Sequence, residues 1–302
     1  MEILFCKNKD IDRKAWDDCI DASLNTQVYA FSWYLDATAG NWDALVYGNY
    51  EAVMPLTYRR KMGIEYLYQP YFVQQLGIFS KEKLKETESR FFFNEVIKNY
   101  RFADIYVNAS FLPKQNDFNA KPRKNHILDL NANYEILKKP YSISTRRNIQ
   151  KAANEGLHLK TMKAELVLEL FKAFNPTNNL AEPDYKAFLN LVKAAQSNAE
   201  TIIEGVFNHK EELQSAGIFI LSSKRLYYLM GASTGDGKKA GAMHFLFDSL
   251  IQQFAGQEMT FDFEGSEIEG VARFFKSFGA IESVYYHLKM NRLPFPLKLL
   301  KR

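Results

Sequence analysis

The sequence contains the same succession of three short strands twice, and this repeat constrains the fold more than any other feature. The first copy consists of apolar runs joined by short turns, at residues 44–47, 52–58 and 64–68. The second copy has the same order, again with a basic turn before its last run, at residues 204–207, 216–221 and 226–230. Because matching turns accompany matching strands, the pattern favours an internal duplication with an offset of about 160 residues over a chance meander.

Patterns typical of helices surround both copies, which favours a mixed sheet flanked by helices. We therefore expect an α+β protein with two domains, residues 1–140 and 141–302, each built on a mixed, mostly antiparallel sheet. The length of 302 residues also favours two domains. The second domain is expected to begin with a helix that Ser144 caps and that stops at Gly156.

The composition excludes several classes of protein. Hydrophobic residues make up 47% of the chain and aromatic residues 15%, which is enough for a large core and excludes a disordered chain. No apolar run approaches the ~20 residues that a membrane span requires, so we expect a cytoplasmic protein without a transmembrane segment. Cys6 and Cys19 have no metal-ligand spacing, and we expect buried thiols, no metal site and no bound cofactor.

Basic residues are concentrated in two parts of the sequence. Nine lysines and arginines lie between Lys121 and Lys160, against three acidic residues, and five more basic residues follow from Lys289 onward. A basic surface attracts ligands that carry phosphates, but a solvated helix face has the same composition. On the expected helix 144–155, the basic side chains are Arg146, Arg147 and Lys151.

A glycine-rich segment, residues 231–241, leads from an expected strand into an expected helix. Small residues allow a phosphate to approach the free N–H groups of a helix start, and two lysines add positive charge. The candidate phosphate-binding residues are Gly235, Gly237, Lys238, Lys239 and Gly241. A flexible surface loop would have the same composition, so the spacing alone leaves both interpretations open.

Two carboxylates lie at the end of another expected strand, in the run from Phe261 to Ser266. Asp262 and Glu264 alternate with phenylalanines, so they are predicted to share one face of the strand. A carboxylate in this position can act as the general base for an amine. It can equally cap the following helix or support the structure.

Aromatic and amide side chains mix between Tyr66 and Gln75, where a buried glutamine would need several hydrogen-bond partners. Such a mixture suits a cleft for a sugar or a peptide, with Gln69, Tyr71 and Gln74 as the candidate contacts. The five histidines are scattered without metal-ligand spacing, and no nucleophile motif appears.

These features together resemble a known family. The glycine-bearing loop, the run Phe261 to Ser266, the run Gly270 to Ala280 and the pair Tyr285-Tyr286 resemble the C-terminal core of GNAT acyltransferases. The whole chain, with its duplicated architecture and its Gln69-Pro70 pair, is similar to the FemAB-type branch, which has two GNAT-like domains. FemAB-type enzymes transfer aminoacyl groups from aminoacyl-tRNA to a peptidoglycan precursor, and single-domain relatives use acetyl-CoA.

The resemblance implies an N-acyltransferase that moves an acyl or aminoacyl group to a primary amine, with a cell-wall precursor as the expected acceptor. It implies an acyl-transferring second domain and an acceptor-binding first domain. For this activity we expect Glu264 and Asp262, the two carboxylates at the strand end, to be the catalytic residues. Donor phosphates would bind at the glycine-rich segment, and the acceptor would contact Gln69, Tyr71, Gln74, Arg146, Arg147 and Lys151. The donor would be aminoacyl-tRNA or an acyl-CoA, so tRNA is an expected partner and DNA is not.

Two positions depart from the pattern of CoA-dependent GNAT enzymes. The stretch Lys238 to Met243 lacks the final small residue of the usual CoA-binding motif, and Phe275 stands where many members carry a tyrosine acid. Two alternatives therefore remain beside the aminoacyl transferase. One is an acetyl-CoA-dependent N-acetyltransferase of an amino sugar or small amine, and the other is a degenerate GNAT pair that binds without chemistry.

Overall fold

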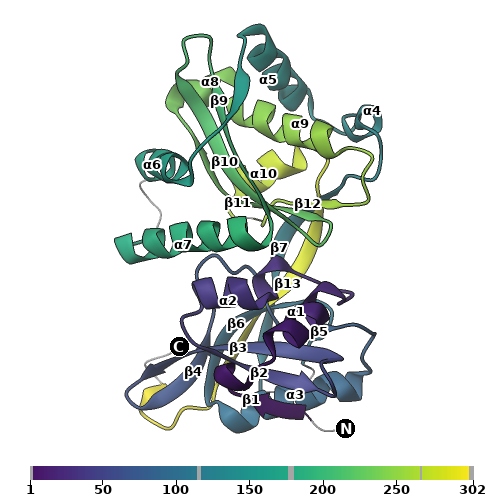
Figure 1. The fold of residues 1–302 in the computed structure, drawn as a ribbon, viewed down its shortest axis with the longest axis vertical. Helices are drawn as coiled ribbons and strands as arrows, with labels where there is room; N and C mark the ends of the chain where they lie inside the picture. The colour runs from purple at the N-terminus through teal and green to yellow at the C-terminus, as the bar shows by residue number, and fades with distance from the viewer. Residues whose placement is uncertain (1–2, 114–116, 176–179, 266, 299–302) are drawn as a thin grey trace. The chain divides into compact units, whose positions relative to one another are not determined.

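A computed structural model describes residues 3–113, 117–175, 180–265 and 267–298. The described chain divides into two compact units (Figure 1). Unit 1 comprises Met1–Arg123 and Val284–Arg302, and unit 2 comprises Lys124–Ser283. The chain thus crosses between the units twice, within one long strand on the way out and near the start of another on the way back.

The sheet of unit 1 has the order β1-β2-β3-β4-β6-β13, and a short strand β5 also pairs with β3. All neighbours are antiparallel except β4 and β6, which run parallel. The strands are β1 (Ile3–Cys6), β2 (Trp42–Tyr47), β3 (Ala52–Lys61), β4 (Ile64–Tyr68), β5 (Phe79–Ser80), β6 (Phe102–Asn108) and β13 (Ile281–Asn291).

Helices pack against this sheet through large apolar side chains. Phe92, Phe93 and Val96 of one helix form a buried cluster with residues from β2, β3, β4, β6 and β13. Trp16 and Trp42 meet at a ring distance of 5.1 Å elsewhere in the unit. The helical segments are η1 (Asn8–Asp10), α1 (Arg13–Asp21), η2 (Val28–Ala30), α2 (Ser32–Thr38) and α3 (Glu86–Asn99).

The sheet of unit 2 has the order β7-β12-β11-β10-β9-β8. Its neighbours are again antiparallel, with the single exception of β11 and β12. The strands are β7 (Asn119–Asp129), β8 (His158–Thr161), β9 (Glu200–Phe207), β10 (Leu213–Ser222), β11 (Arg225–Ser233) and β12 (Thr260–Asp262).

One aromatic cluster holds the helices of unit 2 on its sheet. Phe247 of the central helix stacks on Phe261 at 5.5 Å and on Phe263 at 5.6 Å, and Phe275 and Phe278 complete the cluster. Two further helices, α6 and α7, contact β9, β10 and β11 without joining this cluster. The helices are α4 (Tyr134–Leu137), α5 (Ile143–Asn154), α6 (Ala164–Phe174), α7 (Glu182–Asn198), α8 (Gly235–Ala240), α9 (Ala242–Phe254) and α10 (Glu269–Lys276).

The structure has the predicted α+β class with two similar units. In unit 1 the antiparallel meander β2-β3-β4 is followed by the parallel strand β6, and in unit 2 the meander β9-β10-β11 is followed by the parallel strand β12. The domain limits differ from those expected at residue 140. Residues 124–140 belong to unit 2 because Leu128, Leu130 and Leu137 enter its core, whereas Leu288 and Met290 enter the core of unit 1.

Two local predictions change in the structure. Ser142, rather than Ser144, caps α5, because the Thr145 N–H donates to the Ser142 side chain. Residues 231–233 of the glycine-rich segment belong to β11, and residues 235–240 form the short helix α8 instead of a loop.

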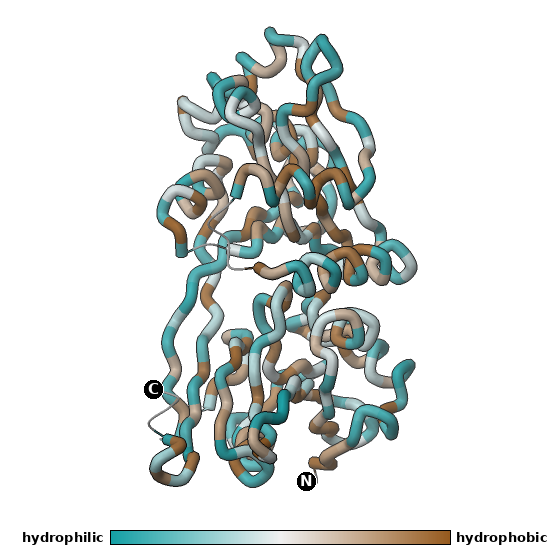
Figure 2. Tube along the Cα trace, turned by 90° about the vertical axis from the view of Figure 1, so that its left-hand side faces the viewer, coloured by the Kyte–Doolittle hydropathy of each residue, from teal (hydrophilic) through white to brown (hydrophobic). Residues whose placement is uncertain are grey.

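Hydrophilic residues interrupt the hydrophobic ones throughout both units (Figure 2). Within the described ranges, no helix combines the length and the apolar character of a membrane span.

Candidate functional site

Strands β11 and β12 diverge in the middle of unit 2. Their parallel pairing covers only three residue pairs, from Arg225 opposite Thr260 to Tyr227 opposite Asp262. Strand β11 continues as far as Ser233, whereas β12 ends at Asp262. Residues 228–233 of β11 therefore extend beyond the last residue of their parallel neighbour, and β10 is their paired strand.

A β-bulge lies directly after this point. Phe219 of β10 is opposite Tyr228 and Ile218 is opposite Met230, so Leu229 has no partner residue across the strand pair. A bulge leaves its extra residue outside the hydrogen-bond ladder and turns nearby side chains, and bulges are frequent next to active sites. The bulge thus lies within residues 228–233, the part of β11 that extends beyond β12.

A pocket of about 340 Å³ opens beside this stretch of β11. Its walls come from β11, α8, α9 and α10, and they combine apolar side chains with a lysine and a serine. The lining residues are Tyr228, Ser233, Gly237, Lys238, Gly241, Met243, His244, Gly270, Val271, Phe274 and Phe275. A volume of this size is within the range of small-molecule sites.

The N-terminus of helix α9 contributes backbone donors to the pocket wall. Gly241 ends α8 with a φ of +76° and starts α9, and a Cβ at this position would lie 2.6 Å from the carbonyl oxygen of Asn148. The first intrahelical bond of α9 runs from the Phe245 N–H to the Gly241 carbonyl. The preceding N–H groups of a helix have no intrahelical acceptor, and together with the helix dipole they favour an anion.

The structure divides the predicted phosphate-binding residues between two places. Gly237, Lys238 and Gly241 line the pocket beside β11. Lys239 pairs with Asp236 at 3.0 Å and lines a separate hollow of unit 2. Gly235 is exposed at the start of α8.

Two backbone N–H groups of the predicted phosphate-binding segment already donate hydrogen bonds within the protein. The Gly237 N–H donates to Thr234 Oγ1 at 2.8 Å, and the Lys238 N–H donates to the Thr234 carbonyl at 3.0 Å. A Cβ at Gly237 would lie 1.9 Å from the Gln214 carbonyl oxygen, so the glycine is required for packing of α8 on β10. The Lys238 side chain and the α9 N-terminus are the features that remain for an anion.

Glu264 is close enough to Tyr228, a pocket residue, for its charge to act on the phenol. Burial and the negative charge of Glu264 raise the pKa of the Tyr228 phenol, which therefore stays protonated at neutral pH. The Tyr228 hydroxyl lies 2.6 Å from the position that a Cβ at Gly231 would occupy, so it is close to the backbone beyond the bulge. A carboxylate and a protonated phenol thus lie at the point where the strands diverge.

Asp262 has a different environment from Glu264. Its side chain is completely buried, and it accepts hydrogen bonds from Asn125 Nδ2 at 3.0 Å and from the Glu264 N–H at 2.9 Å. Arg225 Nη1 lies 3.0 Å from its other oxygen. These contacts fit a structural role for Asp262 better than the predicted catalytic role. In the structural role, its carboxylate fixes the position of Glu264.

Asp262 and Glu264 do not share one face of a strand, although the sequence predicted that they would. Strand β12 ends at Asp262, and Glu264 has a φ of +55°, so the two-residue alternation stops before it. Ser266, the last residue of the predicted run, lies outside the described residues.

His244 and Tyr228 are pocket residues that the sequence analysis did not select. Burial lowers the pKa of His244 to about 4, so its imidazole is neutral at pH 7. Its ring packs edge-on against Phe274 at 4.8 Å. Neither residue belongs to a recognisable motif, so the sequence contained no signal that would have selected them.

In unit 1 the corresponding space between diverging strands is occupied by the chain itself. Strand β4 pairs with β6 only at two positions, and Gln69 then accepts a hydrogen bond from the Tyr106 N–H at 2.9 Å and donates to the Val73 carbonyl at 2.7 Å. Further along, the Leu76 N–H donates to the Tyr106 carbonyl and the Asn108 N–H donates to the Leu76 carbonyl. Both ends of the Gln69 amide therefore serve the structure of unit 1.

The other predicted acceptor contacts lie in both units. In unit 1, Tyr71 is exposed and Gln74 accepts a hydrogen bond from Gln75. In unit 2, the three basic residues lie on α5: Arg147 is exposed, Arg146 donates to the Lys139 carbonyl, and Lys151 donates to the Lys239 carbonyl at 2.9 Å. Lys151 is therefore next to α8, and it lines the same hollow as Lys239.

Comparison with solved structures identifies the fold. The chain matches the crystal structure of FemX over 100% of both chains, with a TM-score of 0.71 and 14% identity. It also matches the C-terminal domain of a putative lysylphosphatidylglycerol synthetase from Agrobacterium fabrum, with a TM-score of 0.61, 13% identity and coverage of 96% and 94%. A third match, L-PGS from Bacillus licheniformis, has a TM-score of 0.51, 12% identity and coverage of 87% and 88%.

These similarities show that the chain has the fold of FemX, in agreement with the α+β fold of two similar units that the sequence predicted. No protein-family model matches the sequence, and no curated protein sequence matches it.

Proposed function

We propose that this chain, which shares its fold with FemX, is an N-acyltransferase that moves an acyl or aminoacyl group to a primary amine. The observation that carries the proposal is the pocket where β11 and β12 diverge, with its bulge, its lysine and its helix N-terminus on one side and Glu264 nearby. A transferase needs a place for an activated carbonyl beside donors for its oxygen and a base for the amine. Unit 2 contains a candidate for each part.

The donor occupies the pocket with its phosphates toward Lys238 and the α9 N-terminus. The apolar wall of Met243, Val271 and Phe274 contacts the uncharged part of the donor. Backbone N–H groups of residues 229–233 then lie beside the carbonyl oxygen and stabilise the negative charge that develops on it.

Glu264 acts as the general base. A primary amine is protonated at neutral pH, and a carboxylate beside the reacting carbon can accept its proton. The amine nitrogen then attacks the carbonyl carbon, and the bond from that carbon to the ribose oxygen of aminoacyl-tRNA or to the sulfur of an acyl-CoA breaks. Tyr228, which stays protonated, can donate a proton to the departing oxygen.

The acceptor and the donor are the finer parts of the proposal. A cell-wall precursor is proposed as the acceptor because of the resemblance to FemAB-type enzymes, and the basic residues Arg146, Arg147 and Lys151 would bind its phosphates or those of tRNA. Aminoacyl-tRNA is the proposed donor because the usual CoA-binding motif is incomplete between Lys238 and Met243. An acetyl-CoA-dependent reaction on a small amine is the alternative outcome of the same assay.

Two neighbouring lysines provide the test of the donor site. Lys238 lines the pocket, whereas Lys239 is paired with Asp236 and lines a different hollow. We expect Lys238→Ala to weaken donor binding at least tenfold, since a charge-assisted contact contributes about 1.5–3 kcal/mol, and Lys239→Ala to leave it within twofold. Calorimetric titration with acetyl-CoA and with aminoacyl-tRNA measures the effect and shows which donor binds.

A turnover assay with the bound donor and a panel of primary amines then tests the activity. Formation of an amide product supports the proposal. Donor binding without any product would favour the binding protein without chemistry, and equal effects of the two lysine variants would remove the pocket from the donor site.

A further inference from the structure

The tip of the β3–β4 hairpin exposes an apolar side chain in an unfavourable position. Lys61 and Ile64 are the last paired residues, so Met62 and Gly63 form the whole turn. Both have positive φ values, 51° and 78°, a conformation in which Asn-Gly is preferred because most side chains are strained there. Met62 is nevertheless 80% exposed. Neither the backbone conformation nor burial accounts for a methionine at this position.

A second apolar tip follows strand β13. The chain turns back after Asn291, whose side chain donates to the Lys298 carbonyl at 3.1 Å, and the Lys298 N–H donates to the Pro294 carbonyl. Phe295 lies within this turn and is 82% exposed. It is an aromatic ring held in water by an ordered segment.

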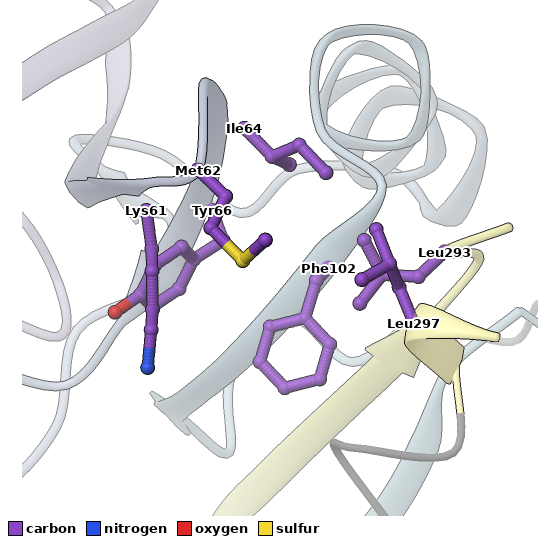
Figure 3. Close-up of a pocket in the computed structure, with 7 residues that line it drawn as sticks. All are labelled: Lys61, Met62, Ile64, Tyr66, Phe102, Leu293 and Leu297. Carbon is purple, nitrogen blue, oxygen red and sulfur yellow. The ribbon is translucent and has the colours of Figure 1, made fainter.

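An apolar pocket of about 130 Å³ joins the two tips. It is lined by Lys61, Met62, Ile64, Tyr66, Phe102, Leu293 and Leu297. In Figure 3, the hairpin side chains lie on one side of Phe102, and Leu293 and Leu297 lie on its other side. The pocket is smaller than a typical ligand site, but it makes the hairpin and the C-terminal turn one continuous apolar surface. We call residues 60–64 and 292–298 the docking tip.

The docking tip is surrounded by positive charge. Five exposed basic residues lie on it or next to it: Arg60, Lys61, Arg101, Arg292 and Lys298. Arg292 is connected to Arg101 through its backbone N–H. The acidic side chains beside them are Glu65, opposite Arg60 across the hairpin, and Asp117, 3.7 Å from Arg292. Among these described side chains, the five cations exceed the two acids by three.

We propose that the docking tip binds the surface of an anionic phospholipid bilayer. Met62 and Phe295 enter the region between the headgroups and the acyl chains, and the surrounding lysine and arginine side chains contact lipid phosphates. Exposed apolar side chains that are surrounded by cations favour a position at the bilayer surface. Apolar insertion alone and charge attraction alone each give only weak binding. A nucleic acid would account for the cations but not for the exposed methionine and phenylalanine. The proposal does not depend on the proposed acyl transfer.

Sedimentation of the full chain with sucrose-loaded vesicles tests the proposal. One vesicle population consists of phosphatidylcholine alone and the other also contains about 30% phosphatidylglycerol, which supplies negative charge. We expect partitioning into the anionic vesicles, with weaker binding at higher salt because screening reduces the attraction. Phosphatidylcholine vesicles should bind at least tenfold less protein.

Substitutions separate the apolar and the charged contributions. We expect the double variant Met62→Ser and Phe295→Ser to weaken binding at least tenfold, since two apolar side chains lose their contact with lipid. Lys61→Glu should weaken it at least fivefold, because one favourable charge is lost and one unfavourable charge is added. The controls are Leu24→Ser, an apolar side chain of the same unit that is 73% exposed, and Lys83→Glu, an exposed lysine outside the docking tip.

Three outcomes would overturn the proposal. One is no binding of the native sequence to anionic vesicles at low salt. Another is equal loss of binding in the controls and in the docking-tip variants. The third is that Lys61→Glu loses binding while the double apolar variant retains it, which would indicate a purely electrostatic surface such as one for nucleic acid.

Discussion

The two units contain the same strand arrangement, but the space where the parallel strands diverge is filled by the chain in unit 1 and is open in unit 2. In unit 1 the parallel pairing ends with Tyr68 opposite Asp104, and in unit 2 it ends with Tyr227 opposite Asp262. Beyond this point, unit 1 fills the gap with residues 69–76, which bond to β6, whereas unit 2 keeps a pocket of about 340 Å³.

The difference indicates how a duplicated scaffold can divide its tasks. A strand that loses its parallel neighbour exposes backbone donors and acceptors, which must find partners or contact a ligand. Unit 1 satisfies these groups within the chain through Gln69 and Leu76. Unit 2 leaves space for a ligand, which is why the proposed chemistry is located there.

The largest expected effect comes from the two matched aspartates. Asp262 is fully buried and is paired with Arg225, whereas Asp104 is 42% exposed and is paired with His287 at 2.6 Å. We expect Asp262→Ala to lower the free energy of unfolding by about 3–5 kcal/mol, because it leaves a charged partner without its counterion. Asp104→Ala should cost less than about 1 kcal/mol, as is usual for an exposed pair.

Denaturant unfolding of both aspartate variants measures this difference. Equal losses of stability would show that the two junctions are equivalent, and the comparison between the units would then fail at its central position.

The next largest expected effect is on turnover, and it concerns Glu264 in unit 2. We expect Glu264→Gln to reduce turnover by about 10²-fold or more, because the amide cannot accept the proton of the amine. Glu269→Gln is the matched control, since Glu269 is an exposed acid of the same unit with a surface contact to Arg273. Steady-state kinetics with the donor identified by calorimetry checks the prediction, and native turnover in Glu264→Gln would exclude this residue as the base.

A third effect is the pH dependence that histidines contribute in unit 2, which contains the two described histidines with lowered pKa values, His126 and His244. The pKa of His244 is about 4 in the folded chain, below its ordinary value of 6.5. Between these values the unfolded chain binds more protons, so stability falls as the pH decreases. We expect a loss of about 2 kcal/mol between pH 7 and pH 5 from this residue.

Chemical denaturation of the native sequence and of His244→Gln at both pH values isolates this contribution. The variant should lose less stability on acidification, and an unchanged pH dependence would contradict the assigned direction.

The smallest expected effect is a loss of stability in unit 1, where residues 69–76 fill the space beside β6. Gln69→Ala removes the acceptor of the Tyr106 N–H and the donor to the Val73 carbonyl, so we expect a loss of about 1–2 kcal/mol in the free energy of unfolding. Donor binding should remain unchanged because it occurs in unit 2. A variant of native stability with a raised KM for the acceptor would instead favour the acceptor-binding role predicted from the sequence.

Much of the fold could be predicted because the repeated strands carry their own pattern. The meanders β2-β3-β4 and β9-β10-β11 follow from alternating apolar runs and short turns, which are local properties of the sequence. The assignment of β13 to unit 1 could not be predicted, because pairing of Leu288 opposite Ile105 connects residues far apart in the sequence. The short helix α8 was missed because four glycines in the eleven residues 231–241 resemble a loop.

The candidate site was accessible to sequence analysis only in part. Glycine and lysine composition indicated the region of Lys238, but not that Lys239 would turn to the other side of α8. The burial of Asp262 depends on Asn125 and Arg225, which come from two other strands. Tyr228 became a candidate only when the end of the β12 pairing was known.

The double crossing of the chain affects how the protein is made. Residues 1–123 leave the ribosome well before β13, so β6 has an unpaired edge while unit 2 is being synthesised. Unit 2 is a continuous segment and can complete its own sheet first, apart from the start of β7. The nascent first unit therefore has to wait until β13 has been translated, and during this time its open edge is a place for chaperones to bind and for aggregation to begin.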